Sequence, residues 1–211
     1  IMSVLGDALT GEAVQKGRSL FKDRVGQVVA SPLVTVVDDG TLSLGLQAAP
    51  FDGEGSPTGR MTLVVEGRLQ GFLHNWYTAR RGGVRSTGNA TRSSYRATPE
   101  VSATNFFLAP GELDPGDIIG GVEAGLYVMD VFGLTTGAAN PMSGDLSLGV
   151  SGRWIAGGEL AAPVREVTVA GNLLAMLRDV DAVGNDLQFV PMKGFWGSPT
   201  FRVSSLVISG T

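Results

Sequence analysis

The sequence predicts a strand-rich α+β fold: a mostly antiparallel sheet or a barrel-like body, accompanied by a few short helices. Glycine is frequent, at 31 of 211 residues, and many glycines separate short apolar segments, which is typical of strands joined by tight turns. Hydrophobic residues make up 43% of the chain and charged residues 17%, enough for a sizeable core. No fixed-period repeat or linker-like stretch interrupts the chain, so we expect a single domain over residues 1–211.

Charge and cysteine content narrow the possible function classes. The formal net charge is −4, which weighs against general nucleic-acid binding because that binding depends on neutralising phosphates. The absence of cysteine excludes disulfides and fits a cytoplasmic protein. No apolar stretch is long enough to cross a membrane, so we expect no membrane partner. The chain starts at Ile1 without a signal peptide, and we expect that an earlier region is missing from it.

The first part of the chain predicts a helix, a strand and a loop. Apolar residues recur at helical spacing over residues 11–25, which predicts a helix there. The β-branched run over residues 33–37 predicts a buried strand, and the following Asp-Asp-Gly at 38–40 predicts a turn. Residues 43–59 are rich in Gly, Pro and Ser and predict a long loop, a kind of segment that is often functional.

The next segments predict a hairpin and a capped helix. Two apolar segments, 61–65 and 69–73, flank a glycine-containing turn, which predicts a β-hairpin. Residues 75–81 predict a short helix, because the glycine pair at 82–83 can end it. The polar, arginine-rich segment 84–105 follows as a loop.

The middle of the chain predicts a strand, a helix and a second strand. A short aromatic strand is expected at residues 106–108. Asp114 and Pro115 predict the start of a helix, as its N-cap and first-turn residue, and we expect that helix to reach about Gly125. A strand over residues 126–134 follows, with a possible break at Asp130.

The last third predicts mainly strands. Residues 146–155 alternate, with Leu146, Leu148, Val150, Gly152 and Trp154 expected on one face. A glycine pair at residues 157–158 predicts the turn that returns this strand. Gly171 and Asn172 precede a short helix over residues 173–177, and residues 200–208 predict a final strand.

Histidine and cysteine content limits the possible metal chemistry. Most zinc sites in proteins use imidazole and thiolate ligands, but this chain has one histidine, His74, and no cysteine. A lone histidine can be a general base. Because no nucleophile pattern accompanies it, we favour a structural or surface role for His74.

Four carboxylates lie on neighbouring predicted loops: Asp38, Asp39, Asp52 and Glu54. One interpretation is a site for a hard cation such as Ca²⁺ or Mg²⁺, which prefers oxygen ligands. The other is that these side chains cap their own turns. We favour the turns, because the spacing of a calcium-binding loop is absent.

A run of arginines forms the second charged feature. Its members are Arg80, Arg81, Arg85, Arg92 and Arg96, and no acidic residue interrupts them before Glu100. This run of arginines can be a solvated loop without a binding role, or it can be a surface that binds an anion or a protein partner. Only Tyr95 is interleaved with the run, which gives little support for single-stranded nucleic acid.

Several short phrases, taken together and in order, resemble the TldD/PmbA family, whose members are also labelled modulators of DNA gyrase. They stand at residues 29–33, 36–41, 51–55, 71–73, 77–80, 86–90, 108–111, 143–145, 170–172 and 183–187. The set covers nearly the whole chain. The resemblance is to the C-terminal domain of such proteins, and it implies that the family's N-terminal domain is not present in this chain.

Within the family, the resemblance distinguishes two branches. The TldD-like branch looks like a zinc peptidase, with a His-Glu-x-x-x-His helix and a late cysteine. A count without gaps places Met2, Ser3 and Asp7 at the three motif positions, and residues 188–198 contain no cysteine. The chain is therefore more similar to the PmbA branch, also called TldE. Phrases at 134–137, 149–152 and 171–174 also resemble that branch.

The resemblance implies a non-catalytic PmbA/TldE-like subunit that partners a TldD-like zinc metallopeptidase in proteolysis of unfolded or modified peptides. It implies no cofactor in this chain and zinc in the partner. It also makes Arg80, Ser86, Thr87, Gly88 and Asn89 candidates for lining the peptide cavity. Two alternatives stay open: a divergent metallopeptidase that acts itself as a homodimer and uses Asp7 and other carboxylates, or a regulatory scaffold. Whether the chain is an enzyme is therefore open as well.

Overall fold

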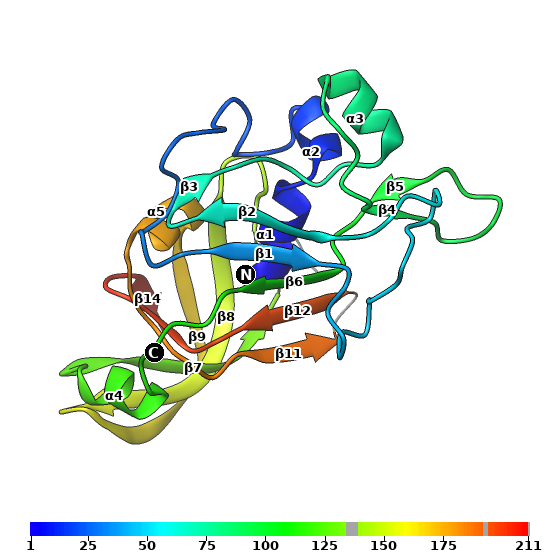
Figure 1. Ribbon diagram of the computed structural model, residues 1–211. Coiled ribbons are helices and arrows are strands. Elements are labelled where there is room, and N and C mark those ends of the chain that lie inside the picture. The colour runs from blue at the N-terminus through cyan, green and yellow to red at the C-terminus, as the bar shows by residue number, and fades with distance from the viewer. Residues whose placement is uncertain (134–138, 192–193, 211) are drawn as a thin grey trace.

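The computed structural model describes residues 1–133, 139–191 and 194–210. Figure 1 shows two sheets with short helices between and around them. The helices are α1 Met2–Ala8, α2 Gly11–Gln15, α3 Trp76–Gly82, α4 Pro115–Gly120 and α5 Leu173–Arg178. Within the described ranges, no helix is long and apolar enough to cross a membrane.

The larger sheet has six strands in the order β11-β12-β6-β1-β2-β3. These strands are β1 Val36–Asp39, β2 Arg60–Val65, β3 Arg68–Leu69, β6 Asn105–Leu108, β11 Gln188–Pro191 and β12 Phe195–Ser198. Neighbouring strands are antiparallel except for β12 and β6, which run parallel.

The second sheet has four antiparallel strands in the order β14-β9-β8-β7. They are β7 Ala124–Phe132, β8 Asp145–Ala156, β9 Glu159–Asn172 and β14 Val207–Ser209. Two ribbons complete the strands: β4 Ala90–Thr91 with β5 Glu100–Val101, and β10 Val180–Val183 with β13 Phe201–Val203. The mostly antiparallel α+β prediction is confirmed. Among the described strands no sheet closes on itself, so the barrel-like alternative is wrong.

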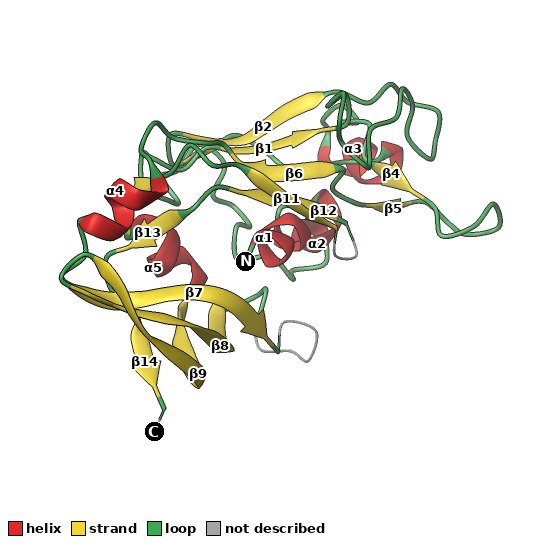
Figure 2. Ribbon diagram, turned by 90° about the horizontal axis from the view of Figure 1, so that it is seen from below, coloured by secondary structure: helices red, strands yellow, loops and turns green. Residues whose placement is uncertain are grey.

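One cluster of buried apolar side chains joins the two sheets. It includes Leu5 of α1, Val36 of β1, Phe106 of β6, Leu148 of β8 and Leu173 of α5. Helix α1 lies between the two sheets (Figure 2). Burial of these side chains is the main source of stability, since apolar area removed from water contributes about 25 cal/mol per Å².

Local signals in the sequence predicted several elements correctly. The hairpin of β2 and β3 turns through Glu66 and Gly67, which both have positive φ values, 47° and 76°. Its second strand is shorter than the expected segment 69–73, because β3 ends at Leu69. Asn75, Asp114 and Asn172 are the N-caps of α3, α4 and α5. The turn at residues 157–158, the irregular pairing of β7 just before Asp130 and the long loop over residues 43–59 are also observed.

Helices were predicted too long. The helix expected over residues 11–25 ends at Gln15, because Lys16 caps it and Gly17 adopts a left-handed φ of 66°. The helix expected to reach Gly125 ends at Gly120, and β7 begins at Ala124. Beyond α2, Leu20 and Phe21 join the core from a non-helical backbone, whereas Val25 is exposed.

Strand boundaries and faces also differ from the prediction. Asp38 and Asp39 belong to β1 and pair with neighbouring strands, so the predicted turn at 38–40 starts too early. The pairing of β8 with β9 shifts register after Val150, which buries Ile155 and leaves Trp154 39% exposed. The predicted strand over residues 200–208 is two strands, β13 and β14, which belong to different sheets. The phrase at residues 134–137 lies outside the described residues.

Candidate functional site

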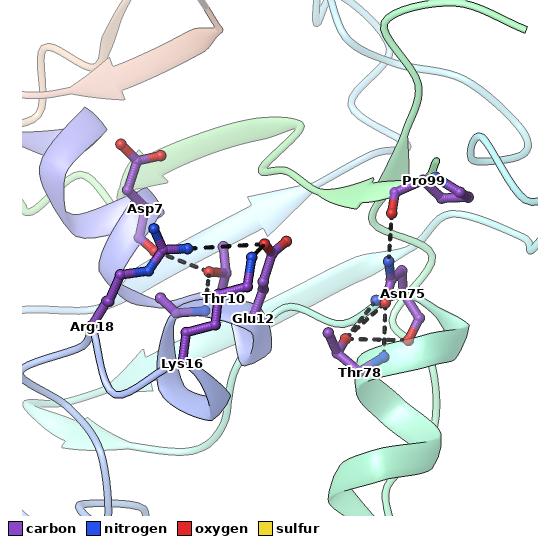
Figure 3. Close-up of polar contacts among 9 residues, drawn as sticks. Asp7, Thr10, Glu12, Lys16, Arg18, Asn75, Thr78 and Pro99 are labelled. Atoms are coloured by element: carbon purple, nitrogen blue, oxygen red, sulfur yellow. Dashed lines mark hydrogen bonds and ion pairs between the residues drawn. The ribbon is translucent and has the colours of Figure 1, made fainter. Parts of the chain in front are cut away.

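Helix α1 carries the three positions that the resemblance aligns with a metal motif. Met2 is buried, Ser3 is half-buried and Asp7 is exposed, so the three side chains do not converge. Desolvation raises the pKa of Asp7. In Figure 3 no bond is drawn to its carboxylate, and only its main-chain oxygen accepts one, from the Thr10 hydroxyl at 3.0 Å.

The packing of α1 explains why Met2 faces inward. A Cβ atom at Gly6 would lie 2.5 Å from the ring of Trp196 on β12, so the glycine permits close contact between helix and sheet. Met2, Leu5 and Ala8 fill the space on the core side. Within the described residues, no group of three or more His, Cys, Asp or Glu side chains is placed to hold a metal ion.

His74 lies in the interior between α2 and α3. It is 9% exposed, and its Nδ1 lies 3.2 Å from the Thr78 hydroxyl oxygen. A Cβ at Gly11 would lie 2.2 Å from the imidazole ring, so the ring packs directly on the start of α2. Burial lowers the pKa of His74. These observations support a structural histidine that is neutral at pH 7.

The segment that contains Ser86, Thr87, Gly88 and Asn89 is tied into the interior by a chain of hydrogen bonds. The main-chain N–H of His74 donates to the Thr87 hydroxyl at 2.7 Å, and that hydroxyl donates to Asn89 Oδ1 at 2.6 Å. Asn89 Nδ2 in turn donates to Asp38 Oδ2 at 2.6 Å. Ser86 hydroxyl contacts the His74 carbonyl at 3.3 Å. A role in lining a peptide cavity stays a prediction for these residues.

Gly88 is required by its surroundings. Its φ is +74°, and a Cβ there would lie 2.2 Å from the carbonyl oxygen of Pro57. The segment after α3 therefore lies directly against the 43–59 loop. Asp52 of that loop strengthens the contact, since its Oδ2 accepts a 3.0 Å bond from the Ala90 N–H.

Asp38 is the buried end of this chain of bonds. Its carboxylate is 1% exposed and also accepts bonds from the N–H and hydroxyl of Thr104 at 2.7 and 2.9 Å. Desolvation raises the pKa of Asp38, although the bonds from Asn89 and Thr104 oppose that shift. These contacts could not be predicted from the sequence, because the hydrogen-bond partners of Asp38 are 51 and 66 residues away along the chain.

The other three carboxylates each serve a different local purpose. Desolvation acts to raise the pKa of Asp39, but hydrogen bonds from Thr41 and Arg60 outweigh it, and the pKa is lowered. Asp52 Oδ1 accepts from the N–H groups of the next residues in its loop, at 54 and 56. Glu54 accepts from the N–H of Trp76 at 2.8 Å. The capping interpretation therefore holds for Asp52 and, through Thr41, for Asp39, whereas Asp38 and Glu54 bond to distant segments.

The arginines of the run are all exposed, but they have different surroundings. Arg92 donates to the carbonyls of Gly53 and Ala97 at 2.8 and 2.7 Å, and so connects the loops. Arg96 lies over the ring of Tyr95, 5.1 Å from its centroid. Arg80, Arg81 and Arg85 have no ion pair with another described residue.

The two aromatic residues at the start of α3 were not among the candidates predicted from the sequence. Trp76 and Tyr77 are 62% and 67% exposed. Asn75 caps the helix: its Oδ1 accepts from the Thr78 N–H at 2.9 Å, and its Nδ2 donates to the Pro99 carbonyl (Figure 3). The signal that could have revealed the exposed face is the helical spacing of small and large residues in α3.

A family model, named relatives and solved structures that are similar to this chain all point to the same family. Residues 1–210 match the model described as PmbA/TldA metallopeptidase C-terminal domain. The chain is 31% identical to the protein named metalloprotease TldD homolog of Buchnera aphidicola subsp. Acyrthosiphon pisum, an alignment that covers 98% of this chain and 45% of that protein.

Two crystal structures share the fold closely. One, from Thermotoga maritima, is of a protein described as a proposed modulator of a DNA gyrase: TM-score 0.87, 32% identity, 99% of this chain and 48% of that one. The other is TldE from Thermococcus kodakarensis: TM-score 0.87, 26% identity, 98% of this chain and 46% of that one. The chain thus spans about half the length of these relatives, which include proteins named for both TldD and TldE.

Proposed function

The chain belongs to the PmbA/TldD metallopeptidase family, and we propose that it is a non-catalytic, PmbA/TldE-like subunit that partners a TldD-like zinc metallopeptidase in proteolysis of unfolded or modified peptides. Its part in that pair is to help enclose the substrate and to hold an extended peptide. We also propose that the protein is cytoplasmic.

The observation that carries the proposal is the donor set of α1. By the resemblance and a count without gaps, the family's zinc motif aligns with Met2, Ser3 and Asp7. At the two ligand positions, Met2 offers a thioether, which has little affinity for Zn²⁺, and it is buried away from the exposed Asp7. At the position of the general base, the hydroxyl of Ser3 cannot replace a carboxylate. The single histidine of the sequence packs on α2 and bonds to Thr78. These residues do not fit a zinc ion, so we assign no catalytic step to this chain.

The strand edges suit the holding of an extended peptide. β7 is an outer strand of the four-stranded sheet, and its residues from Val128 to Phe132 are exposed. Main-chain hydrogen bonding at such an edge binds a peptide with little regard to its sequence. A subunit that contributes edges and walls needs no metal of its own.

The test is a metal and activity measurement on the chain alone and with a TldD-like subunit. We expect less than about a tenth of an equivalent of zinc, iron or manganese after purification without chelators. We expect no hydrolysis of an unfolded peptide by the chain alone, and co-purification with the TldD-like subunit. Near-stoichiometric metal together with EDTA-sensitive hydrolysis by the chain alone would instead establish the metallopeptidase alternative.

A further inference from the structure

We propose that one exposed surface at α3 docks acidic polypeptide segments. The surface consists of Trp76, Tyr77, Arg80 and Arg81 of the helix together with the exposed Arg85 that follows it in the chain, and we call it the α3 face. The inference rests on the proposed function, because it takes the partner to be a peptide or protein segment; it adds the chemical class of that segment.

The geometry of α3 separates this face from the core. With about 100° per residue, Trp76, Tyr77, Arg80 and Arg81 lie within an arc of roughly 140°, and all four are exposed. Thr78 and Ala79 lie on the opposite side and are 2% and 1% exposed. The helix is therefore anchored through its small residues and presents its large ones to solvent.

The indole of Trp76 is exposed but held in place. Its main-chain N–H donates to Glu54 Oε2 at 2.8 Å, and its Nε1–H donates to the Ser56 hydroxyl at 2.7 Å. Both acceptors belong to the 43–59 loop, which Gly88 and Asp52 tie to the rest of the molecule. A ring fixed in this way loses little conformational entropy when a ligand binds, which favours affinity.

The charge of the α3 face specifies the partner. No Asp or Glu occurs between Glu66 and Glu100. The Glu54 carboxylate is bonded at the start of α3, whereas Arg80 and Arg81 lie in its last turn. Arg80, Arg81 and Arg85 have no ion pair with another described residue. The helix dipole accounts for arginines in a last turn, but not for two exposed aromatic rings beside them. A segment that combines carboxylates with apolar side chains would use both groups, since Trp, Tyr and Arg dominate protein-binding hot spots.

A polypeptide fits the whole molecule better than nucleic acid. The chain carries a net charge of −4, so a long polyanion that extends beyond the α3 face would be repelled. A short acidic segment can contact the arginines without contacting the acidic remainder. Figure 1 shows α3 at the periphery, on the side of the molecule away from α4.

The experiment measures binding of short fluorescein-labelled peptides to the purified chain by fluorescence anisotropy. The probes are an alternating Glu/Leu peptide, the same peptide with Lys or with Gln in place of Glu, and a short single-stranded oligothymidylate. We expect the Glu/Leu peptide to bind tightest. Arg80→Glu/Arg81→Glu should weaken that binding at least about tenfold, and Trp76→Ala by about tenfold.

The matched control is Arg178→Glu. Arg178 is also an exposed arginine in the last turn of a short helix, α5. Its reversal changes the net charge half as much as the double variant does, so Arg81→Glu alone is the variant that it matches. Arg178→Glu should change binding by less than about twofold. If the double variant fails to fold by circular dichroism, Arg85→Glu and Tyr77→Ala take its place, with weakening expected in both.

Several results would overturn the inference. These are equal binding of the Glu, Gln and Lys peptides, oligothymidylate binding as tight as that of the Glu/Leu peptide, an equal loss in Arg178→Glu, or an α3 face that only mediates association between copies of this chain. None of them bears on the metal and co-purification test. The failure of the docking surface and the failure of the proposed function can therefore be told apart.

Discussion

Two glycines just after α3 have nearly the same backbone conformation but different surroundings. Gly83 has φ +67° and open space around it, whereas a Cβ at Gly88 (φ +74°) would meet the Pro57 carbonyl at 2.2 Å. We expect Gly83→Ala to lower the free energy of unfolding by about 1 kcal/mol and Gly88→Ala by roughly 3 kcal/mol. Urea denaturation of both variants measures the difference. Equal losses would show that the 43–59 loop simply moves away.

His74 gives the molecule a pH dependence with a defined sign. Burial lowers the pKa of the folded state below the ordinary value of 6.5, so below that pH the unfolded chain binds more protons than the native one. The free energy of unfolding should therefore fall as the pH drops from about 6.5 through the lowered pKa, and stay unaffected by this residue above 6.5.

The corresponding measurement is urea denaturation across that pH range for the wild type and for His74→Gln. The variant has no other histidine, so its unfolding free energy should fall less on acidification. The overall stability of the variant is not the readout, because Gly11 packs on this ring. An unchanged slope would contradict a buried neutral imidazole.

At the scale of elements, α3 depends on its N-cap more than α4 does. Asn75 is 2% exposed, forms a reciprocal capping box with Thr78 and also donates to the Pro99 carbonyl. Asp114 is exposed and accepts one bond, from the Gly116 N–H at 2.7 Å. We expect Asn75→Ala to cost about 2 kcal/mol and Asp114→Ala about 1 kcal/mol or less.

Thermal and urea unfolding of both cap variants would check this order. The Asn75 variant should also expose the segment around Pro99 to proteolysis, because it loses a tie between α3 and the ribbon of β4 and β5. A larger loss for Asp114→Ala would mean that α4 supports its sheet more than its contacts indicate.

The molecule as a whole is held by its apolar cluster and by satisfied polar groups. The cluster reaches from α1 through both sheets to α5. Within the described residues, no buried polar side-chain atom lacks a hydrogen-bond partner. A chain stabilised in this way should need no metal to fold.

We therefore expect EDTA not to change the midpoint of thermal unfolding. We also expect an equimolar concentration of zinc not to raise this midpoint. Differential scanning calorimetry with and without chelator measures both. A midpoint that falls with EDTA would reveal a structural ion and would favour the metallopeptidase alternative.

Local chemistry could be predicted from the sequence because its causes lie within a few residues. The N-caps Asp114 and Asn172 and the glycine turns belong to this class. Asn75 was expected as the first residue of its helix and is the N-cap instead. The scarcity of zinc ligands also needed no coordinates, because a count of His and Cys suffices. The resemblance to the family could also be recognised without coordinates, because it rests on the order of short sequence phrases.

Only the tertiary structure decided features that depend on distant partners. Asp38 stays within a strand because Asn89 and Thr104 supply donors to its carboxylate. Ile155 is buried in place of Trp154 because the pairing with β9 shifts register. Long-range pairing and packing select among conformations that local sequence leaves nearly equal in free energy, and they placed Trp76 and its neighbouring arginines on the open side of α3.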